Sequence, residues 1–254
     1  MNRLPLTSRL LLVCLGSLAI WALGPSQALA QSDSGLWLSG GLRIRLSDEL
    51  RLDAGAQLRL DSDWGRVASV FPEVGLSYEI SETLRLGIGY RLVLRRLRPN
   101  GDFGPAQRLH VDARFKWKIE KIFLSYRLRL QEGLQHRTSG LALRHMIRNL
   151  VGVAYDTDME LTPFASMELY NRLGGGPGFS FDRWRITIGV KLELEPHSFE
   201  IFYRAQIPIA DYGQDPTEHI LGLGYTYELD DRKPRGRRPR DRGDDRDAGL
   251  DRGY

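Results

Sequence analysis

Arginine is the residue type in this chain whose number and spacing best suit a chemical task. Pairs of arginines two positions apart recur, as in Arg127 and Arg129, with an apolar residue between them. Successive side chains of a β-strand point to opposite faces, so each pair would lie on one face of a strand. A surface of guanidinium groups suits the lining of a narrow pore that prefers anions. The candidate ligand-binding or pore-lining residues are Arg91, Arg114, Arg127, Arg129, Arg148, Glu168, Arg185 and Arg204.

The same residues could instead be purely structural. Acids such as Asp112 and Glu168 fall on the arginine face of the predicted strands, although they are fewer than the arginines. His110 and His219 are also predicted to lie on this face. An ion-pair network that fills the interior of the protein is therefore the simpler hypothesis, and an anion-preferring pore is the sharper one.

The histidines offer a second kind of chemistry, but no catalytic motif accompanies them. His145 and Asn149 share a face of their predicted strand with Ile147. They resemble the outward-facing His and Ser of lipid-processing barrels, except that Ile147 stands where the serine is needed. The sequence contains no H-E-x-x-H, G-x-S-x-G or P-loop motif and no cysteine metal site. We therefore predict no enzyme, no metal and no cofactor, and keep an outer-membrane lipid-modifying or hydrolytic enzyme as the alternative.

The elements that would position these side chains are strands with one apolar and one charged face. The clearest stretch is 108–130, which reads as two strands around a turn at Glu120 and Lys121. Every odd position from Leu109 to Ile119 is apolar or aromatic, and the positions between them are charged or histidine. A helix would need a period near 3.6 residues, which this stretch lacks.

The alternation recurs along the chain and predicts the fold class. It marks eleven stretches, at 36–46, 50–60, 68–80, 84–94, 108–119, 122–131, 143–155, 161–169, 184–194, 199–207 and 219–229. Bacterial single-chain barrels have an even number of strands. We therefore predict an all-β, closed, antiparallel up-and-down transmembrane β-barrel of about 12 strands over residues 31–229, with 10 strands as the alternative. The segments 96–106 and 133–140 are predicted to be loops.

Three features favour a membrane barrel over a soluble β-sandwich. The strands reach about ten residues, which a tilted membrane strand needs. Nearly all strand glycines, such as Gly75 and Gly222, fall on the polar face, where a narrow interior needs room. Aromatic residues on the apolar face gather near the short turns, as in an interfacial girdle: Tyr78, Trp117, Tyr155, Phe199 and Tyr227. The predicted location is the outer membrane, and the predicted partners are its lipid and its assembly machinery. A soluble secreted β-sheet protein is the third hypothesis.

The first thirty residues are predicted to be a cleavable signal peptide. Arg3 and Arg9 precede an apolar run at 10–23, and Ala28-Leu29-Ala30 is a small-x-small cleavage site. Cys14, the one cysteine of the 254 residues, lies in this segment. A mature exported chain would therefore contain no disulfide, and closure of a barrel would supply its stability instead.

Residues 230–254 differ in composition from everything before them. They mix arginine and aspartate with glycine and proline and contain almost no apolar residue. Such a segment cannot bury enough surface to fold alone, so we predict a disordered charged tail in the periplasm. Its charge could contact an acidic periplasmic partner. Nucleic acid is not expected as a partner of an exported protein.

Several short segments together resemble a bacterial family of outer-membrane proteins known as domain of unknown function 2490. They are Pro72-Glu73 with 76–78, Gly89-Tyr90-Arg91, 124–129, 163–166 with Glu168-Leu169, Arg185 with Gly189, and 219–223. The resemblance covers roughly residues 37–229. It implies a β-barrel in the outer membrane and offers no established activity or catalytic set. The chain is thus predicted to be an outer-membrane barrel of unknown specific activity, either structural or a narrow anion-preferring pore.

Overall fold

The computed structural model describes residues 33–61, 63–96, 103–137, 140–157, 159–174, 178–209 and 217–230. The predicted signal peptide, residues 1–30, lies outside these residues, as does the predicted tail beyond Asp230. Within the described residues, no helix is long and apolar enough to cross a membrane.

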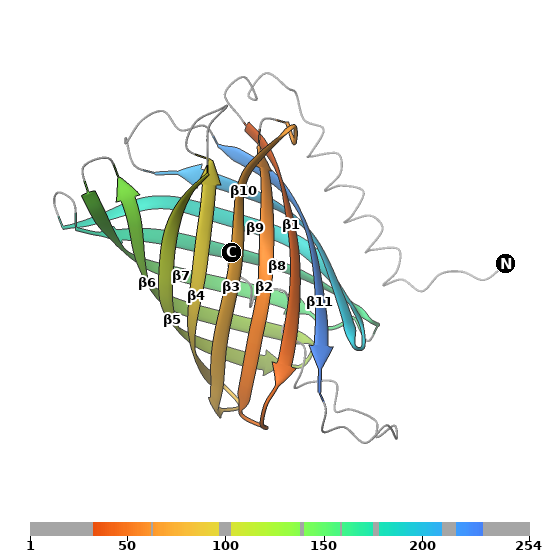
Figure 1. Ribbon diagram of the computed structural model, residues 1–254. Helices are drawn as coiled ribbons and strands as arrows, with labels where there is room; N and C mark the ends of the chain where they lie inside the picture. Colours follow the sequence, from red (N-terminus) through yellow and green to blue (C-terminus); the bar gives the residue numbers. More distant parts are fainter. Residues whose placement is uncertain are drawn as a thin grey trace. The chain divides into compact units, whose positions relative to one another are not determined.

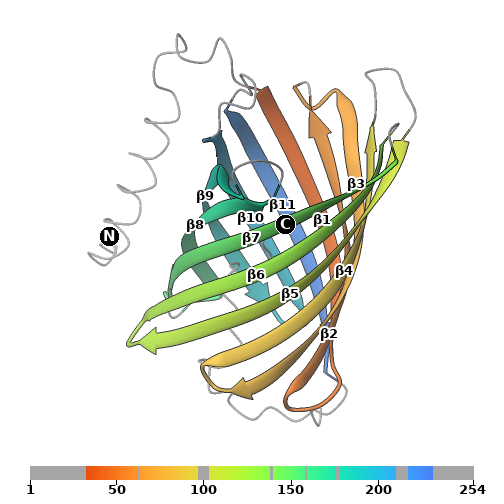
Figure 2. The same cartoon turned by 90° about the vertical axis from the view of Figure 1, so that its left-hand side faces the viewer.

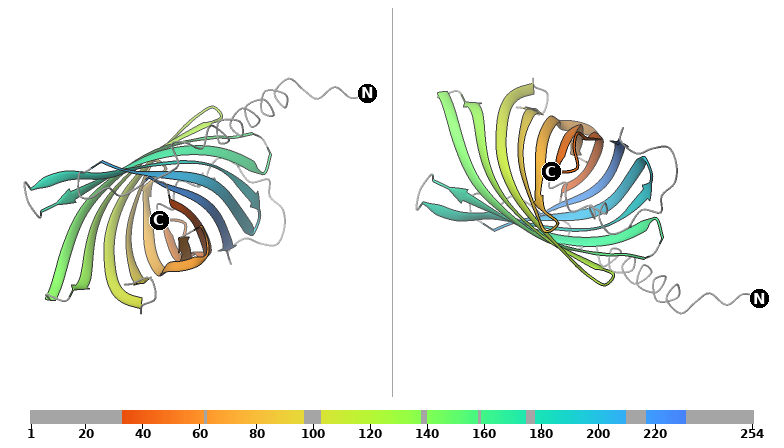
Figure 3. Two further views of the ribbon diagram at one scale, coloured as in Figure 1. Left: turned by 90° about the horizontal axis from the view of Figure 1, so that it is seen from above. Right: turned by 90° about the horizontal axis from the view of Figure 1, so that it is seen from below.

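The described residues form strands throughout. All of the predicted stretches are strands, and most are longer than expected. They are β1 (Asp33–Arg45), β2 (Leu50–Asp61), β3 (Arg66–Ser81), β4 (Leu84–Arg96), β5 (Phe103–Ile119), β6 (Ile122–Arg137), β7 (Gly140–Tyr155), β8 (Leu161–Leu173), β9 (Phe179–Leu194), β10 (His197–Pro208) and β11 (Glu218–Leu229). Each strand pairs with its neighbours in sequence, and β1 pairs with β11, so the sheet closes into a barrel (Figure 1; Figure 3 shows the strands from above and below).

The closing pair corrects the predicted topology. The described part of the chain contains eleven strands, so the predictions of twelve or ten were wrong. Strands that alternate in direction leave the first and last of an odd number running the same way. β1 and β11 accordingly pair in parallel, with Leu38 opposite Leu223, whereas the other neighbours are antiparallel as predicted.

Two predicted loops are largely strand. The segment 133–140 belongs to the β6–β7 hairpin, in which Gly133 pairs with Arg144 and Arg137 with Gly140. Phe103 to Gln107 extends β5 and pairs with the end of β4. Backbone pairing continues there although the apolar alternation fades, because each residue of a hairpin finds its hydrogen-bond partner on the adjacent strand. Figure 2 shows how far β5, β6 and β7 extend.

The connections distinguish the two ends of the barrel. At one end, here called the turn end, short turns follow the odd-numbered strands β1 to β9, for example at Glu120 and Lys121 between β5 and β6. At the other end, here called the loop end, the connections after β4 and β10, residues 97–102 and 209–217, are the two longest between strands. The connections after β2 and β8 are as long as those after β1 and β7, and only residues 138 and 139 separate β6 from β7.

The apolar face of the strands points outward and the arginine face points inward, as predicted. Apolar side chains cover the outside: Leu109, Val111 and Leu130 are each about half exposed, at 48%, 50% and 52%. Arg127 and Arg129 point inward and are 2% exposed. An apolar surface that surrounds a closed barrel is far larger than the patches that water-soluble monomers expose. It is the surface expected of a barrel that spans a bilayer.

Aromatic residues lie on this outer surface near both ends. At the turn end, Tyr78, Trp117, Tyr155 and Phe199 are exposed, and Tyr227 is half-buried beside His197. At the loop end, Phe103, Phe179 and Phe181 are exposed. Two aromatic belts on either side of an apolar band are typical of the two interfaces of a membrane barrel.

The interior also contains a small apolar cluster, formed by Trp37, Ala154, Phe164, Phe202 and Ile220. The ring of Phe202 fills the space beside Gly222, where any Cβ atom would collide with it. Glycine at this position therefore allows a large aromatic side chain to cross the inner face of the neighbouring strand.

The parallel seam gives a direct test of closure. A Cβ atom at Gly224 would lie 3.1 Å from Ser39 Oγ across the β1–β11 pair. We expect Ser39→Cys with Gly224→Cys to form a disulfide, visible as a mobility shift on a non-reducing gel. Ser39→Cys with Thr226→Cys, offset by two residues, should not cross-link. Cross-linking of the offset pair alone would show that the strands pair in another register.

A second prediction concerns the apolar outer surface. Val111 lies at the middle of β5, whereas Leu143 lies near the loop end of β7. Val111→Arg should lower the free energy of unfolding in lipid by ~2–4 kcal/mol, and Leu143→Arg by ~0–1 kcal/mol, because the cost of a charge falls toward the interface. Urea unfolding in vesicles measures both. Equal costs at the two depths would contradict the proposed contact with acyl chains.

Candidate functional site in the barrel lumen

All eight residues predicted from the sequence lie on the inner face of the barrel. Seven of them are buried, and Arg114 is half-buried. The alternation of each strand turns these side chains inward while their apolar neighbours face outward. The cross-strand register then brings seven of them together into two clusters centred on acids and one centred on an aromatic ring, while Arg91 pairs with Glu73 on β3.

The first cluster, here called the Glu168 hub, joins three predicted arginines to one carboxylate. Arg127 Nη2 donates to Glu168 Oε1 at 2.7 Å, and Arg148 donates to both carboxylate oxygens at 3.0 Å. Arg185 Nη1 lies 3.4 Å from Oε2, and the Tyr170 hydroxyl donates to the same oxygen at 2.9 Å. Glu168 is 2% exposed. This single buried carboxylate therefore connects side chains from four strands, β6 to β9, out of contact with water.

The second cluster, here called the Asp112 hub, lies on β5 and β6. Arg129 binds the Asp112 carboxylate through two atoms, Nε at 2.6 Å and Nη2 at 2.7 Å. Arg114 Nη2 donates to Asp112 Oδ2 at 2.7 Å. His110 Nε2 lies 4.0 Å from the same oxygen. A bidentate pair of this kind fixes the guanidinium plane as well as its charge.

The acids are needed because the register places arginines opposite each other. Arg129 pairs with Arg148 across β6 and β7, and Arg114 pairs with Arg127 across β5 and β6. Like charges directly opposite in a sheet are destabilising. Arg129 reaches back to Asp112 on β5 and Arg148 reaches forward to Glu168 on β8, so the two guanidinium groups diverge.

The third cluster, here called the Trp37 stack, contains no acid. The Cζ atoms of Arg59, Arg204 and Arg185 lie 3.6, 5.0 and 5.3 Å from the centre of the Trp37 ring. Arg59 also lies 4.3 Å from the ring of Phe71. A guanidinium group over an aromatic face gains ~0.5–2 kcal/mol, which offsets only part of the cost of burying it.

Several inward-facing guanidinium groups of the described residues remain without a carboxylate. Among the described residues, no acid lies within ion-pair distance of Arg59, Arg108 or Arg204. Arg204 is 5% exposed, and although its Nε donates to Thr187, its Nη1 has no hydrogen-bond partner. The positive charges of Arg108 and Arg185 also repel that of Arg59. The lumen can therefore accommodate additional negative charge.

Several functional residues escaped the sequence analysis. Trp37 and Phe71 lie on the inward, mostly polar face of their strands. An aromatic residue on that face was the feature that could have identified them. Tyr170 and Asp182 fall just outside the predicted strands. Asp182 binds three arginines near the loop end, Arg144, Arg172 and Arg183, at 3.1, 2.6 and 2.8 Å.

The histidines divide between the two faces. His110 lies inside the barrel as predicted, but His219 points outward, where its Nδ1 lies 2.5 Å from the Tyr203 hydroxyl. The prediction that His219 faces the lumen was wrong, because it shares the parity of Leu221 and Leu223. His145 lies outside, with its Nδ1 2.5 Å from Glu132 Oε2. Within the described residues, no group of acids, histidines or cysteines could hold a metal ion.

The Glu168 hub yields a prediction about stability. Glu168→Gln removes the charge that three buried arginines share and should lower the free energy of unfolding by ~3–5 kcal/mol. Glu79→Gln is the matched control, because the Glu79–Arg85 pair near the turn end is partly exposed, at 27% and 16%. Its loss should cost at most ~1 kcal/mol. Denaturant titration followed by gel mobility measures both, and similar losses would mean that Glu168 has no organising role.

Similarity to known proteins is found among solved structures and in one protein-family model. Among solved structures, the chain is similar to the NanC porin, with 13% identity and a TM-score of 0.46 over 76% of this chain and 99% of that one. It is also similar to LpxR from Salmonella typhimurium, with 11% identity and a TM-score of 0.42 over 73% of this chain and 84% of that one. No curated protein matches the chain in sequence. The model of the family described as "Protein of unknown function (DUF2490)" matches residues 34–213, most of the described barrel, and the chain therefore belongs to the DUF2490 family.

Proposed function

We propose that this protein is a narrow, anion-preferring channel of a bacterial outer membrane. The observation that carries the proposal is a set of lumenal guanidinium groups without a carboxylate, Arg59, Arg108 and Arg204. Arg204 is buried and Arg59 and Arg108 are half-buried, and a charge removed from water without a carboxylate partner is costly. An anion that enters the lumen supplies the missing charge, whereas a cation meets only repulsion at this level.

The outer surface supports the membrane location. Its apolar band and two aromatic belts match the bilayer core and its interfaces. Short turns of such barrels face the periplasm and longer loops face outward, so the turn end is the periplasmic end in this proposal. Outer-membrane lipid and the assembly machinery are the partners that follow from this location. A tail after β11 would then start on the periplasmic side.

The size of the barrel supports a small conductance. Side chains just fill a barrel of eight strands, while porins with sixteen or more enclose an aqueous channel. The interior described here is occupied over much of its length by the Glu168 hub, the Asp112 hub and the Trp37 stack. Anions would therefore pass one at a time and only as guanidinium side chains move.

Planar-bilayer recording of the full chain tests this function. We expect small single-channel currents whose reversal potential in a salt gradient indicates anion preference. Arg204→Gln and Arg59→Gln together should reduce that preference several-fold, because they remove charges that no described carboxylate neutralises. Arg45→Gln, near the turn end and paired with Asp230 at 3.9 Å, is the control and should change it little. Cation preference would overturn the proposal.

A sealed structural barrel is the second candidate, and burial favours it. Arg127, Arg148 and Glu168 are each 2% exposed, so water does not reach the Glu168 hub. In a sealed barrel these pairs would serve stability alone. The absence of any current from correctly folded protein would select this candidate over the channel.

A lipid-modifying enzyme is the third candidate. One observation favours it: His145 lies on the outer face, with Nδ1 in contact with Glu132. A carboxylate beside a histidine can orient it as a general base. Hydrolysis of outer-membrane lipid by the purified protein, abolished by His145→Ala and retained in His219→Ala, would support this function over transport.

A further inference from the structure

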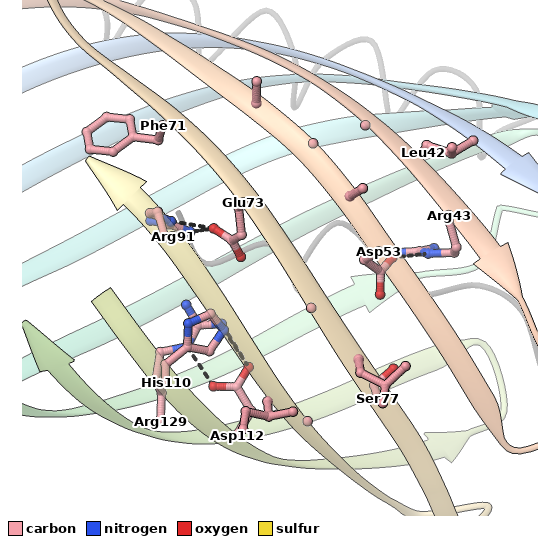
Figure 4. A pocket seen from close by; sticks show the side chains of 18 of the residues that line it. Leu42, Arg43, Asp53, Phe71, Glu73, Ser77, Arg91, His110, Asp112 and Arg129 are labelled. Atoms are coloured by element: carbon pink, nitrogen blue, oxygen red, sulfur yellow. Dashed lines mark hydrogen bonds and ion pairs between the residues drawn. The ribbon is translucent and has the colours of Figure 1, made fainter. Parts of the chain in front are cut away.

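A cavity lies inside the barrel against β1 to β6, between the middle of the barrel and the turn end (Figure 4). Its volume is about 80 Å³, which is room for several water molecules. Charged side chains form one wall, among them Arg91, His110, Asp112 and Arg129. The lining also includes one inward-facing glycine on each of the four adjacent strands β1 to β4, a set here called the glycine wall: Gly41, Gly55, Gly75 and Gly87.

The register places the glycines of this wall on adjacent strands with side chains between them: Gly55 lies opposite Glu73, and Gly75 lies opposite Asp53, in the β2–β3 pair. Gly41 lies opposite Gly55 in the β1–β2 pair, and Gly75 lies opposite Gly89 in the β3–β4 pair. Gly87 lies opposite Asp112 in the β4–β5 pair. Glycine weakens a strand interior and commonly marks a close approach of another backbone or of a ligand. A run of glycines across adjacent strands therefore needs a reason.

Packing explains some inward glycines but not all of them. The ring of His110 occupies the place of a side chain at Gly89, as Phe202 does at Gly222, and at Gly55 a Cβ would lie only 2.7 Å from the backbone oxygen of Gly40. At Gly75 and Gly87, in contrast, an added Cβ would meet its nearest atoms at 3.4 and 3.5 Å, which is ordinary contact. A Cβ atom would therefore fit at both positions without displacing a neighbour. What glycine preserves there is open space inside the lumen.

Water has access to this space. The side chains of Asp53 and Glu73, which line the cavity, retain 36% and 25% exposure although both face inward. Across the cavity, Asp112 and Arg129 are almost fully buried. Since Asp53 is close to the β1–β2 turn, the accessible side of the cavity is the turn end. The cavity is therefore a vestibule on the turn-end side of the lumen.

Phe71 closes the inner end of the vestibule. In Figure 4 it lies beyond the Arg91–Glu73 pair, at the end opposite to Ser77. Phe71 is 2% exposed, and the guanidinium group of Arg59 packs against it at 4.3 Å. Arg59 in turn contacts Trp37. One aromatic ring therefore separates the water-accessible vestibule from the guanidinium groups of the Trp37 stack.

We propose that the path of a permeating anion runs along the glycine wall and that Phe71 is its constriction. The inference rests on the proposed channel function and adds its route and its substrate class. The small vestibule, lined by Arg91 and Arg129 but also by three carboxylates, suits single small inorganic anions such as chloride. Bulky organic anions would not pass between Phe71 and the glycine wall.

Truncation of Phe71 tests the constriction. We expect Phe71→Ala to raise single-channel chloride conductance several-fold in planar bilayers. Phe164→Ala is the matched control: Phe164 is also buried inside the barrel, at 6%, but lies on β8 and lines no part of the vestibule. It should leave conductance unchanged. Heat-dependent gel mobility verifies that both variants fold, and equal effects of the two variants, or none, would overturn the inference.

Thiol labelling tests the route without relying on current. Gly75→Cys and Gly87→Cys should react in the folded barrel with a small anionic methanethiosulfonate reagent, and the reaction should block chloride current. Ala154→Cys, which is inside the barrel but 2% exposed in the apolar cluster, should not react. Cys14 is replaced by serine in all variants, so that each contains one thiol.

The outcomes separate the route from the function. If the wild-type protein conducts anions while the cysteines at positions 75 and 87 remain unreactive, the route is wrong and the channel stands. If both cysteines react but the wild-type protein carries no current, the vestibule is a dead end, and both the channel and the route are refuted. Labelling that blocks an existing anion current supports the route.

Discussion

Closure of the strand ladder is the constraint on which the rest of this structure depends. Each strand finds backbone partners on both sides, because β1 and β11 pair with each other and leave no edge. Closure divides every alternating strand into an outer and an inner row. The outer row is apolar and meets lipid in the proposed membrane location, so the charged row has only the interior to occupy.

The interior then poses a problem of charge. Arginines outnumber acids there, and the register sets several arginines opposite each other. The structure combines three solutions: carboxylates that each hold two or three guanidinium groups, aromatic rings beneath guanidinium groups, and amide side chains such as Gln131 and Gln206 as additional acceptors. What these leave uncompensated, around Arg59 and Arg204, is the physical basis of the proposed preference for anions.

Which side chains point into the barrel could be predicted from the sequence, because the direction of a side chain depends only on its position within its own strand. The period of two assigned Arg127 and Arg129 inward and Leu109 outward without knowledge of any partner. The strand count was wrong because a rule drawn from other bacterial barrels outweighed eleven visible alternations. Which residues meet was not predictable: Glu168 and Arg127 are 41 positions apart in sequence. Their contact depends on the β6–β7 and β7–β8 registers, which alternation does not determine.

The features that could not be predicted from the sequence have separate physical causes. Tyr170 lies where the apolar alternation ends but backbone pairing continues, whereas Asp182 is skipped by a register shift in the β8–β9 pair, in which Tyr170 pairs with Arg183 and Asn171 with Phe181. The vestibule is defined by side chains that are absent, at Gly75 and Gly87. A pattern of glycines on a polar face indicates room, but only coordinates distinguish room that a neighbour fills from room that stays open.

The odd number of strands has a topological consequence. In a barrel with an even count, the first and last strands begin and end at the same rim. Here Asp33 starts β1 at one rim and Leu229 ends β11 at the other, because the two strands run the same way. The polypeptide thus makes one net passage through the layer it spans, and domains fused before β1 and after β11 would be delivered to different compartments.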